Sequence, residues 1–120
     1  MAVLRIVPNL TTPDIATSQA FYHELLGLDV AMDMGWIVTM TTGLSGPVQL
    51  SLANQGGADT PVPDLSIEVD NLDEIYARAT KMGARIPYPM TTESWGIRRF
   101  FVSDPTGRIL NISSHVGDNT

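Results

Sequence analysis

Residues 100–115 read FFVSDPTGRILNISSH, two apolar runs separated by the tetrapeptide Asp-Pro-Thr-Gly. This spacing predicts a β-hairpin, because Pro105 presets the backbone at the second turn position and Gly107 suits the last. The second run carries one amide, Asn111, among apolar neighbours. The reason for a lone amide in a strand otherwise built for a core has to come from the rest of the chain.

Two stretches upstream are typical of capped α-helices. The first runs from Asp14 to Gly27, where Thr12 or Asp14 is the expected N-cap and the glycine ends the helix. The second runs from Asp70, its expected N-cap, to Gly83 and covers the same interval. Apolar side chains recur in both at helical spacing, which predicts one buried face for each helix.

Strand-like segments surround the two helices in the same order. Each helix follows a short β-like run, RIVPNL or DLSIEV, and precedes a glycine with further strand material, GLDV or GARI. The later segments GWIVTMTT and PVQLSLA match RRFFVS and RILNISS in order and spacing. We therefore predict one α+β domain over residues 1–120, with two tandem βαβββ modules at about 1–54 and 64–116 and a linker at about 55–63.

Each predicted module holds a four-stranded sheet and one helix. The helix covers one face of its sheet, which leaves the other face to meet its counterpart in the second module. Such an arrangement predicts a cup-shaped sheet around a central cavity, and a cavity of this kind is where a ligand binds.

Composition narrows the classes of partner. The chain has no cysteine and a formal net charge of −6 with only seven Lys and Arg, which excludes disulfides and zinc–sulfur sites and disfavours binding to phosphate backbones. No apolar run reaches the roughly 18 residues that cross a bilayer, and the start, MAVLRIVPNL, lacks a signal-peptide cleavage region. We expect a cytoplasmic protein without nucleic-acid or membrane partners, whose charge mildly attracts cationic small molecules.

Several segments together resemble the vicinal oxygen chelate superfamily, the group of glyoxalase I, extradiol dioxygenases, methylmalonyl-CoA epimerase and the bleomycin-resistance proteins. The resemblance runs from about Leu4 to His115 and is carried by PNLTTPDIATSQAFYHELLGLDV, GWIVTM, VQLSLA and WGIRRFFVSDPTGRILNI. It implies the same paired βαβββ fold, a homodimer and, in the enzymes of the family, a divalent metal ion held in the cavity.

The resemblance also implies where the metal ligands of those enzymes would fall, namely at Val7, Gln49, Asp64 and Asn111. Val7 cannot bind a metal, Gln49 and Asn111 offer uncharged oxygens, and only Asp64 brings a carboxylate. Transition metals in proteins favour imidazole and carboxylate ligands, so we expect no metal and no other cofactor. Asn111 then stands where an enzyme of the family keeps a glutamate.

The bleomycin-resistance branch of the family lacks the metal and sequesters flat, cationic antibiotics. Aromatic rings stack on such molecules and acidic groups pair with their cations, and Trp36 and Trp95 stand beside glycines at the expected rim of the cup. We therefore predict metal-independent binding of a small organic molecule, with an antibiotic as the narrower prediction. The expected ligand-binding residues are Trp36, Gln49, Asp64, Glu68, Trp95, Arg98 and Asn111.

Two alternatives stay open. The chain can be an enzyme of the same superfamily, a lyase, isomerase or dioxygenase that uses a degenerate divalent-metal site or takes Asp64 or Glu68 as a general base. It can also be a structural or regulatory dimer whose cavity is filled by its own side chains.

The remaining charged candidates are two arginines and two histidines. Arg98 and Arg99 are adjacent on a predicted strand and point to opposite faces, so one of them faces the cavity and would favour an anionic ligand instead. His23 is expected to be a solvent-exposed helical residue, and His115 lies at best at the mouth of the cavity.

Overall fold

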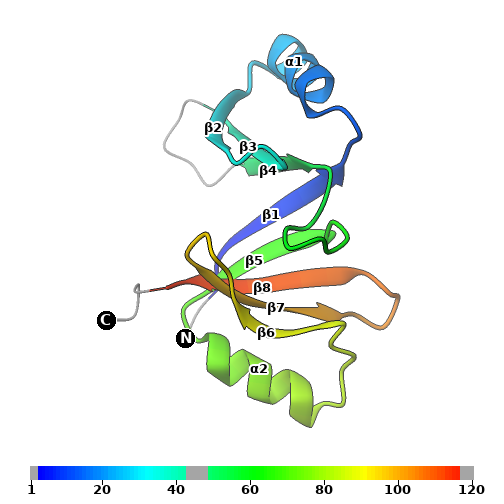
Figure 1. Ribbon diagram of the computed structural model, residues 1–120, viewed down its shortest axis with the longest axis vertical. Helices are drawn as coiled ribbons and strands as arrows, with labels where there is room; N and C mark the ends of the chain where they lie inside the picture. The colour runs from blue at the N-terminus through cyan, green and yellow to red at the C-terminus, as the bar shows by residue number, and fades with distance from the viewer. Residues whose placement is uncertain (1–2, 43–48, 117–120) are drawn as a thin grey trace. The chain divides into compact units, whose positions relative to one another are not determined.

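The computed structural model describes residues 3–42 and 49–116 (Figure 1). Within these ranges, two helices and eight strands follow as two successive βαβββ runs, which confirms the predicted α+β fold. The elements are β1 (Val3–Thr11), α1 (Ile15–Leu26), β2 (Asp29–Asp33), β3 (Ile37–Thr41), β4 (Gln49–Ala53), β5 (Leu65–Val69), α2 (Leu72–Lys81), β6 (Tyr88–Thr92), β7 (Ile97–Ser103) and β8 (Ile109–His115). Pro47 and Val48, which open the predicted strand PVQLSLA, lie outside the described residues.

The eight strands are hydrogen-bonded in the order β2-β3-β4-β1-β5-β8-β7-β6. The chain divides into two compact units: the first unit is residues 7–62, and the second unit joins residues 1–6 to residues 63–120. Strand β1 therefore contributes to both, while the module bounds read from the sequence stay a prediction. In the described part of the chain, neither helix has the length and apolar character that crossing a membrane requires.

The first unit packs α1 on one face of its strands. Strand β4 pairs in parallel with β1 and antiparallel with β3, and β2 lies on the outer side of β3. Ile15 and Tyr22 of the helix contact a buried cluster on the strands. The cluster consists of Val38, Met40 and Leu52.

The ends of α1 follow local rules. Asp14 Oδ1 accepts a hydrogen bond from the Thr17 amide at 3.1 Å, so Asp14 and not Thr12 is the N-cap of the two residues that the sequence offered. Gly27 ends the helix with a φ of 72°, a left-handed conformation that a residue with a side chain rarely adopts. The predicted helix bounds are confirmed here.

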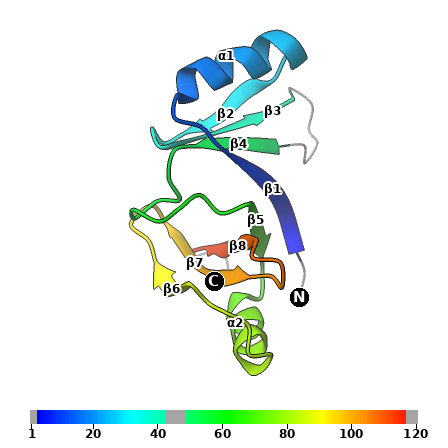
Figure 2. The same cartoon turned by 90° about the vertical axis from the view of Figure 1, so that its right-hand side faces the viewer.

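The second unit places β8 between β5, its parallel partner, and β7, its antiparallel partner, with β6 beyond β7. Helix α2 runs along one face of this sheet (Figure 2). Val69, Phe100 and Ile112 of the strands are buried against Leu72 and Ala79 of the helix. Alternate residues of β5, β7 and β8 therefore face the helix, and the residues between them face the opposite side.

The start of α2 differs from the prediction by one residue. The N-cap is Asn71 and not Asp70, because Asn71 has the non-helical backbone angles and its carbonyl accepts the first helical hydrogen bond, from the Ile75 amide at 3.1 Å. The end agrees with the sequence: Gly83 has a φ of 72°. The Ala84 amide donates to the Ala79 carbonyl at 3.1 Å, one of the bonds that closes a helix of this type.

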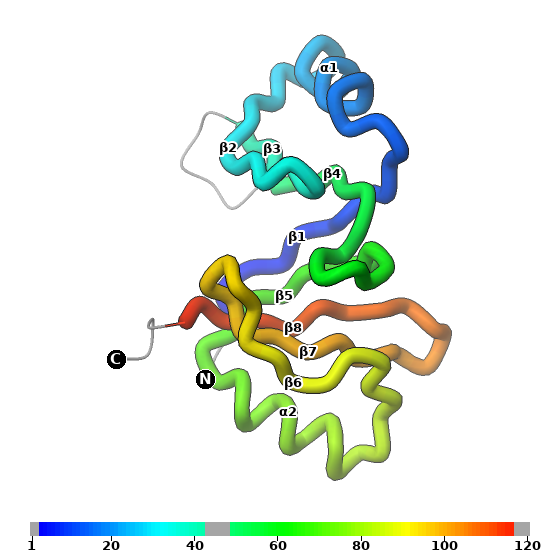
Figure 3. Tube along the Cα trace, in the orientation of Figure 1, coloured from blue at the N-terminus to red at the C-terminus, as the bar shows by residue number. Residues whose placement is uncertain are grey.

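The hairpin of β7 and β8 confirms the prediction made from its turn (Figure 3). The side chain of Asp104 holds the turn, since its Oδ1 accepts from the Thr106 amide at 2.8 Å and from the Arg108 amide at 3.0 Å. The Asp104 amide donates to the Arg108 carbonyl at 2.9 Å. Gly107 has a φ of 90°, which explains the glycine in this turn.

The core of the second unit can be tested with two phenylalanines. Phe100 is fully buried and its ring lies edge-on to that of Tyr76 at 4.8 Å, so Phe100→Ala should lower the free energy of unfolding by about 3–5 kcal/mol. Phe21 is 56% exposed, and Phe21→Ala should cost less than about 1 kcal/mol. Urea denaturation measures both, and equal losses would contradict the core described above.

The turn can be tested by its response to acid. Hydrogen bonds from the Thr106 hydroxyl, then from the backbone amide of Arg108, hold the pKa of Asp104 below its usual 3.8. A lowered folded pKa means that the stabilisation is present above about pH 3.8 and is lost as pH falls through the folded value. Asp104→Asn should therefore destabilise the protein at pH 7 and progressively less toward pH 3. A stability difference that does not change with pH would refute this role.

Candidate functional site

The candidate site is the face of the second unit's sheet that lies opposite α2, which we call the polar face. The register of β5 and β8 sets Ser66 beside Asn111 and Glu68 beside Ser113. Their neighbours in sequence, such as Ile112, pack toward the helix, so these four polar side chains share the other face. The same alternation adds Tyr88, Arg99, Phe101 and His115.

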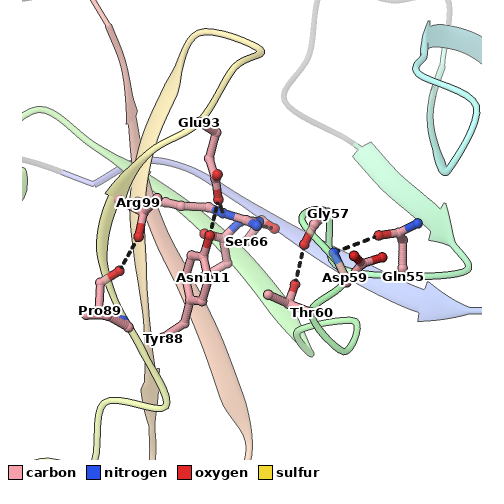
Figure 4. Close-up of polar contacts among 11 residues, drawn as sticks. Gln55, Gly57, Asp59, Thr60, Ser66, Tyr88, Pro89, Glu93, Arg99 and Asn111 are labelled. Atoms are coloured by element: carbon pink, nitrogen blue, oxygen red, sulfur yellow. Dashed lines mark hydrogen bonds and ion pairs between the residues drawn. The ribbon is translucent and has the colours of Figure 1, made fainter.

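Asn111 is the residue that the sequence singled out, and the structure places it near the middle of the polar face. Its Nδ2 donates to Ser66 Oγ at 3.1 Å (Figure 4). Its Oδ1 is buried, and within residues 3–42 and 49–116 it has no hydrogen-bond partner. A buried acceptor left unsatisfied costs about 1–3 kcal/mol, so this oxygen is a point at which a donor from a bound molecule would be stabilising.

Glu68 lies two residues after Ser66 in β5, and its carboxylate contacts one residue of β8 and one of β1. Its Oε2 is 2.5 Å from His115 Nδ1, and its Oε1 is 3.3 Å from Arg5 Nε. The Glu68 side chain is 16% exposed, whereas that of His115 is 45% exposed. Sequence reasoning selected Glu68 and placed His115 only near a cavity mouth. Their separation of 47 residues along the chain gave no local signal for the contact.

The structure separates the two adjacent arginines. Arg98, which the sequence analysis selected, turns toward α2, where its Nη2 lies 2.6 Å from Asp73 Oδ1. The hydrogen bond with Arg98 lowers the pKa of Asp73, and the same bond raises the pKa of Arg98. Arg98 therefore lies on the helix-covered side, and Arg99 is the arginine of the polar face. A role of Arg98 in ligand binding stays a prediction.

Arg99 is buried and faces a buried carboxylate. Its Nε lies 2.6 Å from Glu93 Oε2, which also accepts a hydrogen bond from the Tyr88 hydroxyl at 2.8 Å. The guanidinium carbon lies 5.1 Å from the ring centre of Trp95 and 4.8 Å from that of Phe101, both within cation–π distance. Glu93 and Arg99 were missed as a pair, although the alternation of the strand allowed Arg99 to face this side.

Asp64 has a structural contact at the start of β5. Its Oδ2 accepts a hydrogen bond from the Ile109 amide at 2.8 Å, and its own amide donates to the Ile109 carbonyl at the same distance. The register pairs Asn111 with Ser66 and leaves Asp64 two pairs nearer the start of β8. The carboxylate of Asp64 thus helps to fasten β5 to β8.

Three of the residues selected from the sequence lie in the first unit. Val7 is 7% exposed within β1, and Gln49 opens β4 opposite Thr41 of β3. Trp36 precedes β3 and is half-buried, with its carbonyl accepting from the Asn54 amide at 3.1 Å. The role of Gln49 and Trp36 in ligand binding stays a prediction, whereas Val7 was named only as a family metal position that its alkyl side chain cannot fill.

The donor set at the four family positions does not fit a transition metal. Val7 is an alkyl side chain, Gln49 and Asn111 are amides, and the carboxylate of Asp64 already accepts a backbone hydrogen bond. Among the residues that the structure describes, no three His, Asp or Glu side chains gather closely enough to hold an ion.

A cavity of about 800 Å³ lies on the other side of the second unit's sheet, along α2. Its walls are core side chains such as Ala79, Phe100 and Ile112, with Arg78 and Arg85 among the lining residues. None of the polar-face residues lines it. We place the candidate site on the polar face, because the partly buried ionisable and amide groups gather there.

The buried ion pair can be tested against the exposed one. Glu93→Gln should lower the free energy of unfolding by about 3 kcal/mol, because the buried Arg99 guanidinium would then face a neutral amide. The Asp73 side chain, the partner of Arg98, is 78% exposed. Asp73→Asn should therefore lower the free energy of unfolding by less than about 1 kcal/mol. Denaturation of both variants at one pH decides the matter, and a Glu93→Gln protein as stable as Asp73→Asn would contradict the burial of the pair.

Comparison with known proteins places the chain in a family. Residues 3–112 match the model of the Glyoxalase/Bleomycin resistance protein/Dioxygenase superfamily. No curated protein matches the sequence significantly. Among solved structures, a protein described as an NAD-dependent benzaldehyde dehydrogenase from Legionella pneumophila has a TM-score of 0.73 at 18% identity, over 92% of this chain and 98% of that one.

Two further structures share the fold. A member of the superfamily from Vibrio splendidus 12B01 has a TM-score of 0.69 at 22% identity, covering 94% of this chain and 99% of that one. A methylmalonyl-CoA epimerase from Mycobacterium tuberculosis has a TM-score of 0.66 at 16% identity, covering 95% and 89%. Identities this low establish a common fold and no common activity. Because the family match spans nearly its whole length, the chain belongs to the Glyoxalase/Bleomycin resistance protein/Dioxygenase superfamily.

Proposed function

We propose that the protein binds a small organic molecule on the polar face without a metal ion. The observation that carries this proposal is the buried Oδ1 of Asn111, which has no hydrogen-bond partner among the described residues. Native proteins satisfy nearly all such atoms. An N–H or O–H group of a bound molecule would satisfy this one, and a metal ion would find only a neutral amide there.

The charges of the polar face bear on the kind of ligand. Arg99 suggested an anionic ligand, but its charge is balanced by the buried Glu93 at 2.6 Å. Glu68 is likewise balanced by Arg5. The face therefore presents no net positive charge, and the overall charge of −6 favours a neutral or cationic molecule. This supports a flat, cationic, antibiotic-like ligand as the narrower proposal.

The other readings of the sequence keep some support. Arg99 with Tyr88, Trp95 and Phe101 fills one part of the polar face with the protein's own side chains, as a purely structural dimer would predict. Asn111 Oδ1, elsewhere on the polar face, argues against a purely structural role, because the described side chains leave this buried oxygen without a hydrogen-bond donor. The homodimer and the cytoplasmic location stay predictions.

An enzyme with a carboxylate base is the main alternative. Asp64 is engaged by the Ile109 amide, which makes it the weaker of the two candidates. Glu68 is held between Arg5 and His115, and this contact favours a role beside the imidazole over a role as a lone base.

Binding can be tested by NMR with side-chain amide resonances as reporters. Metal-stripped protein is titrated with a panel of planar aromatic cations and a matched panel of neutral amide-bearing aromatics, with and without Mg²⁺, Mn²⁺ or Zn²⁺. We expect a binder that shifts the Asn111 amide equally with and without metal. Asn111→Ala should weaken it about tenfold or more.

Asn71→Ala is the matched control, because Asn71 is the N-cap of α2, on the helix-covered side of the sheet, and should leave affinity unchanged. Binding that appears only after a metal is added would refute the metal-independent part of the proposal. A binder whose affinity is the same in the Asn111→Ala protein would refute the site.

A further inference from the structure

The cavity of about 800 Å³ along α2 plays no part in the binding proposed for the polar face. It lies within the second unit, between the helix and the sheet face opposite the polar face. Small-molecule sites in proteins have volumes of about 300–1,000 Å³ and mostly apolar walls. The volume of this cavity therefore suits an organic molecule of moderate size.

The walls of this cavity, which we call the helix cavity, are apolar on both sides. Ile75 and Ala79 line it from α2, and Val102, Leu110 and Ile112 line it from β7 and β8. An apolar wall holds water poorly, so an apolar group that enters the cavity gains contacts and displaces little bound water. The walls thus favour a hydrocarbon chain or ring over a polar molecule.

The helix cavity opens to solvent where α2 ends. Met82, which follows the helix, lines the cavity and is 74% exposed. Figure 3 shows the end of α2 and the turn between β7 and β8 at the same end of the sheet, and Pro105 and Gly107 of that turn also line the cavity. A ligand can therefore enter here and leave its polar end at the opening.

Two arginines border the helix cavity, Arg78 and Arg85. Arg78 Nη2 lies 3.3 Å from Glu74 Oε1, so its charge is partly balanced. Arg85 is exposed, and in the part of the chain that the structure describes its guanidinium has no ion pair or hydrogen bond. Its backbone is held in place, because the Arg85 carbonyl accepts from the Ser103 amide at 2.9 Å. An unpaired cation thus stands beside an apolar wall.

Asp104 is the carboxylate among the lining residues, and the hairpin turn already engages it. Its Oδ1 accepts from the amides of Thr106 and Arg108 and from the Thr106 hydroxyl at 2.9 Å. The net charge of −6 is distributed over the whole chain, and salt screens exposed charges beyond about 8–10 Å. The charge that a ligand meets at the opening is therefore that of the arginines.

We propose that the helix cavity is a second ligand site, which binds a small amphipathic carboxylate of the aliphatic monocarboxylic acid class. The hydrocarbon part lies between α2 and the sheet, and the carboxylate accepts hydrogen bonds from the Arg85 guanidinium at the opening. Arginine suits this role, since its planar guanidinium can hold a carboxylate through two parallel hydrogen bonds. The site shares no residue with the polar face and does not depend on the ligand proposed there.

The test uses octanoate as the probe, with 1-octanol as its neutral match and octyltrimethylammonium as its cationic match, each below the concentration at which it forms micelles. Methyl NMR of the unmodified protein follows the titrations. Octanoate should shift the methyl groups of Ala79, Ala84 and Val102 in a saturable way, and 1-octanol should bind about fivefold more weakly. The Asn111 side-chain amide should not respond, which separates this site from the polar face.

Two charge-removing variants test the role of the arginine. Arg85→Gln should weaken octanoate binding about fivefold and leave 1-octanol binding unchanged. Lys81→Gln is the matched control, because it removes the same charge at the end of α2 from a residue that does not line the cavity. Both side chains belong to exposed residues, so both variants should fold.

Absence of saturable octanoate binding would overturn the proposal. So would octanoate shifts confined to the polar face, an equal affinity for 1-octanol or octyltrimethylammonium, or equal losses in Arg85→Gln and Lys81→Gln. A failed ligand screen on the polar face leaves these results standing, and their failure leaves binding at Asn111 intact.

Discussion

The parallel pairing of β5 with β8 is the constraint on which the second unit depends. Its register sets Ser66 beside Asn111 and Ile67 beside Ile112, and successive side chains of a strand point to opposite faces. A slip of one residue would turn the polar side chains under α2 and expose the apolar ones. The same backbone hydrogen bonds therefore determine both the core and the candidate site.

The polar face uses charge in two different ways. Glu93 and Arg99 are almost completely buried, and the Tyr88 hydroxyl and three aromatic rings complete their surroundings. Burial of two charges costs much of what their attraction returns, so this pair defines the path of the chain between β6 and β7 more than it adds stability. Glu68 and His115 keep part of their surface exposed, so this second pair stays in contact with water.

Local signals sufficed for most of the elements but not for the site. The strand expected at GARI, residues 83–86, is wrong, because these residues form no strand and β6 begins only at Tyr88. The hairpin turn and the ends of the helices depend on residues within one turn of chain, and they were predicted, except that Asn71 caps α2 where the residue before it was expected. Two residues that both suit an N-cap differ only in backbone angles. Which arginine faces the polar side depends on the pairing of β7 with β8, and Arg99 was passed over. The contact of Glu68 with His115 joins residues 47 apart and follows from strand order alone.

The second unit is discontinuous in sequence, since residues 1–6 group with residues 63–120. During synthesis the first unit can emerge complete, whereas the initial residues must wait for the end of the chain before they find their partners. Arg5 is one of these initial residues, and its partner Glu68 lies in the part of the chain that is synthesised later. An affinity tag or a deletion placed before β1 would thus act on the part of the protein that is synthesised last, through the contact of Arg5 with Glu68.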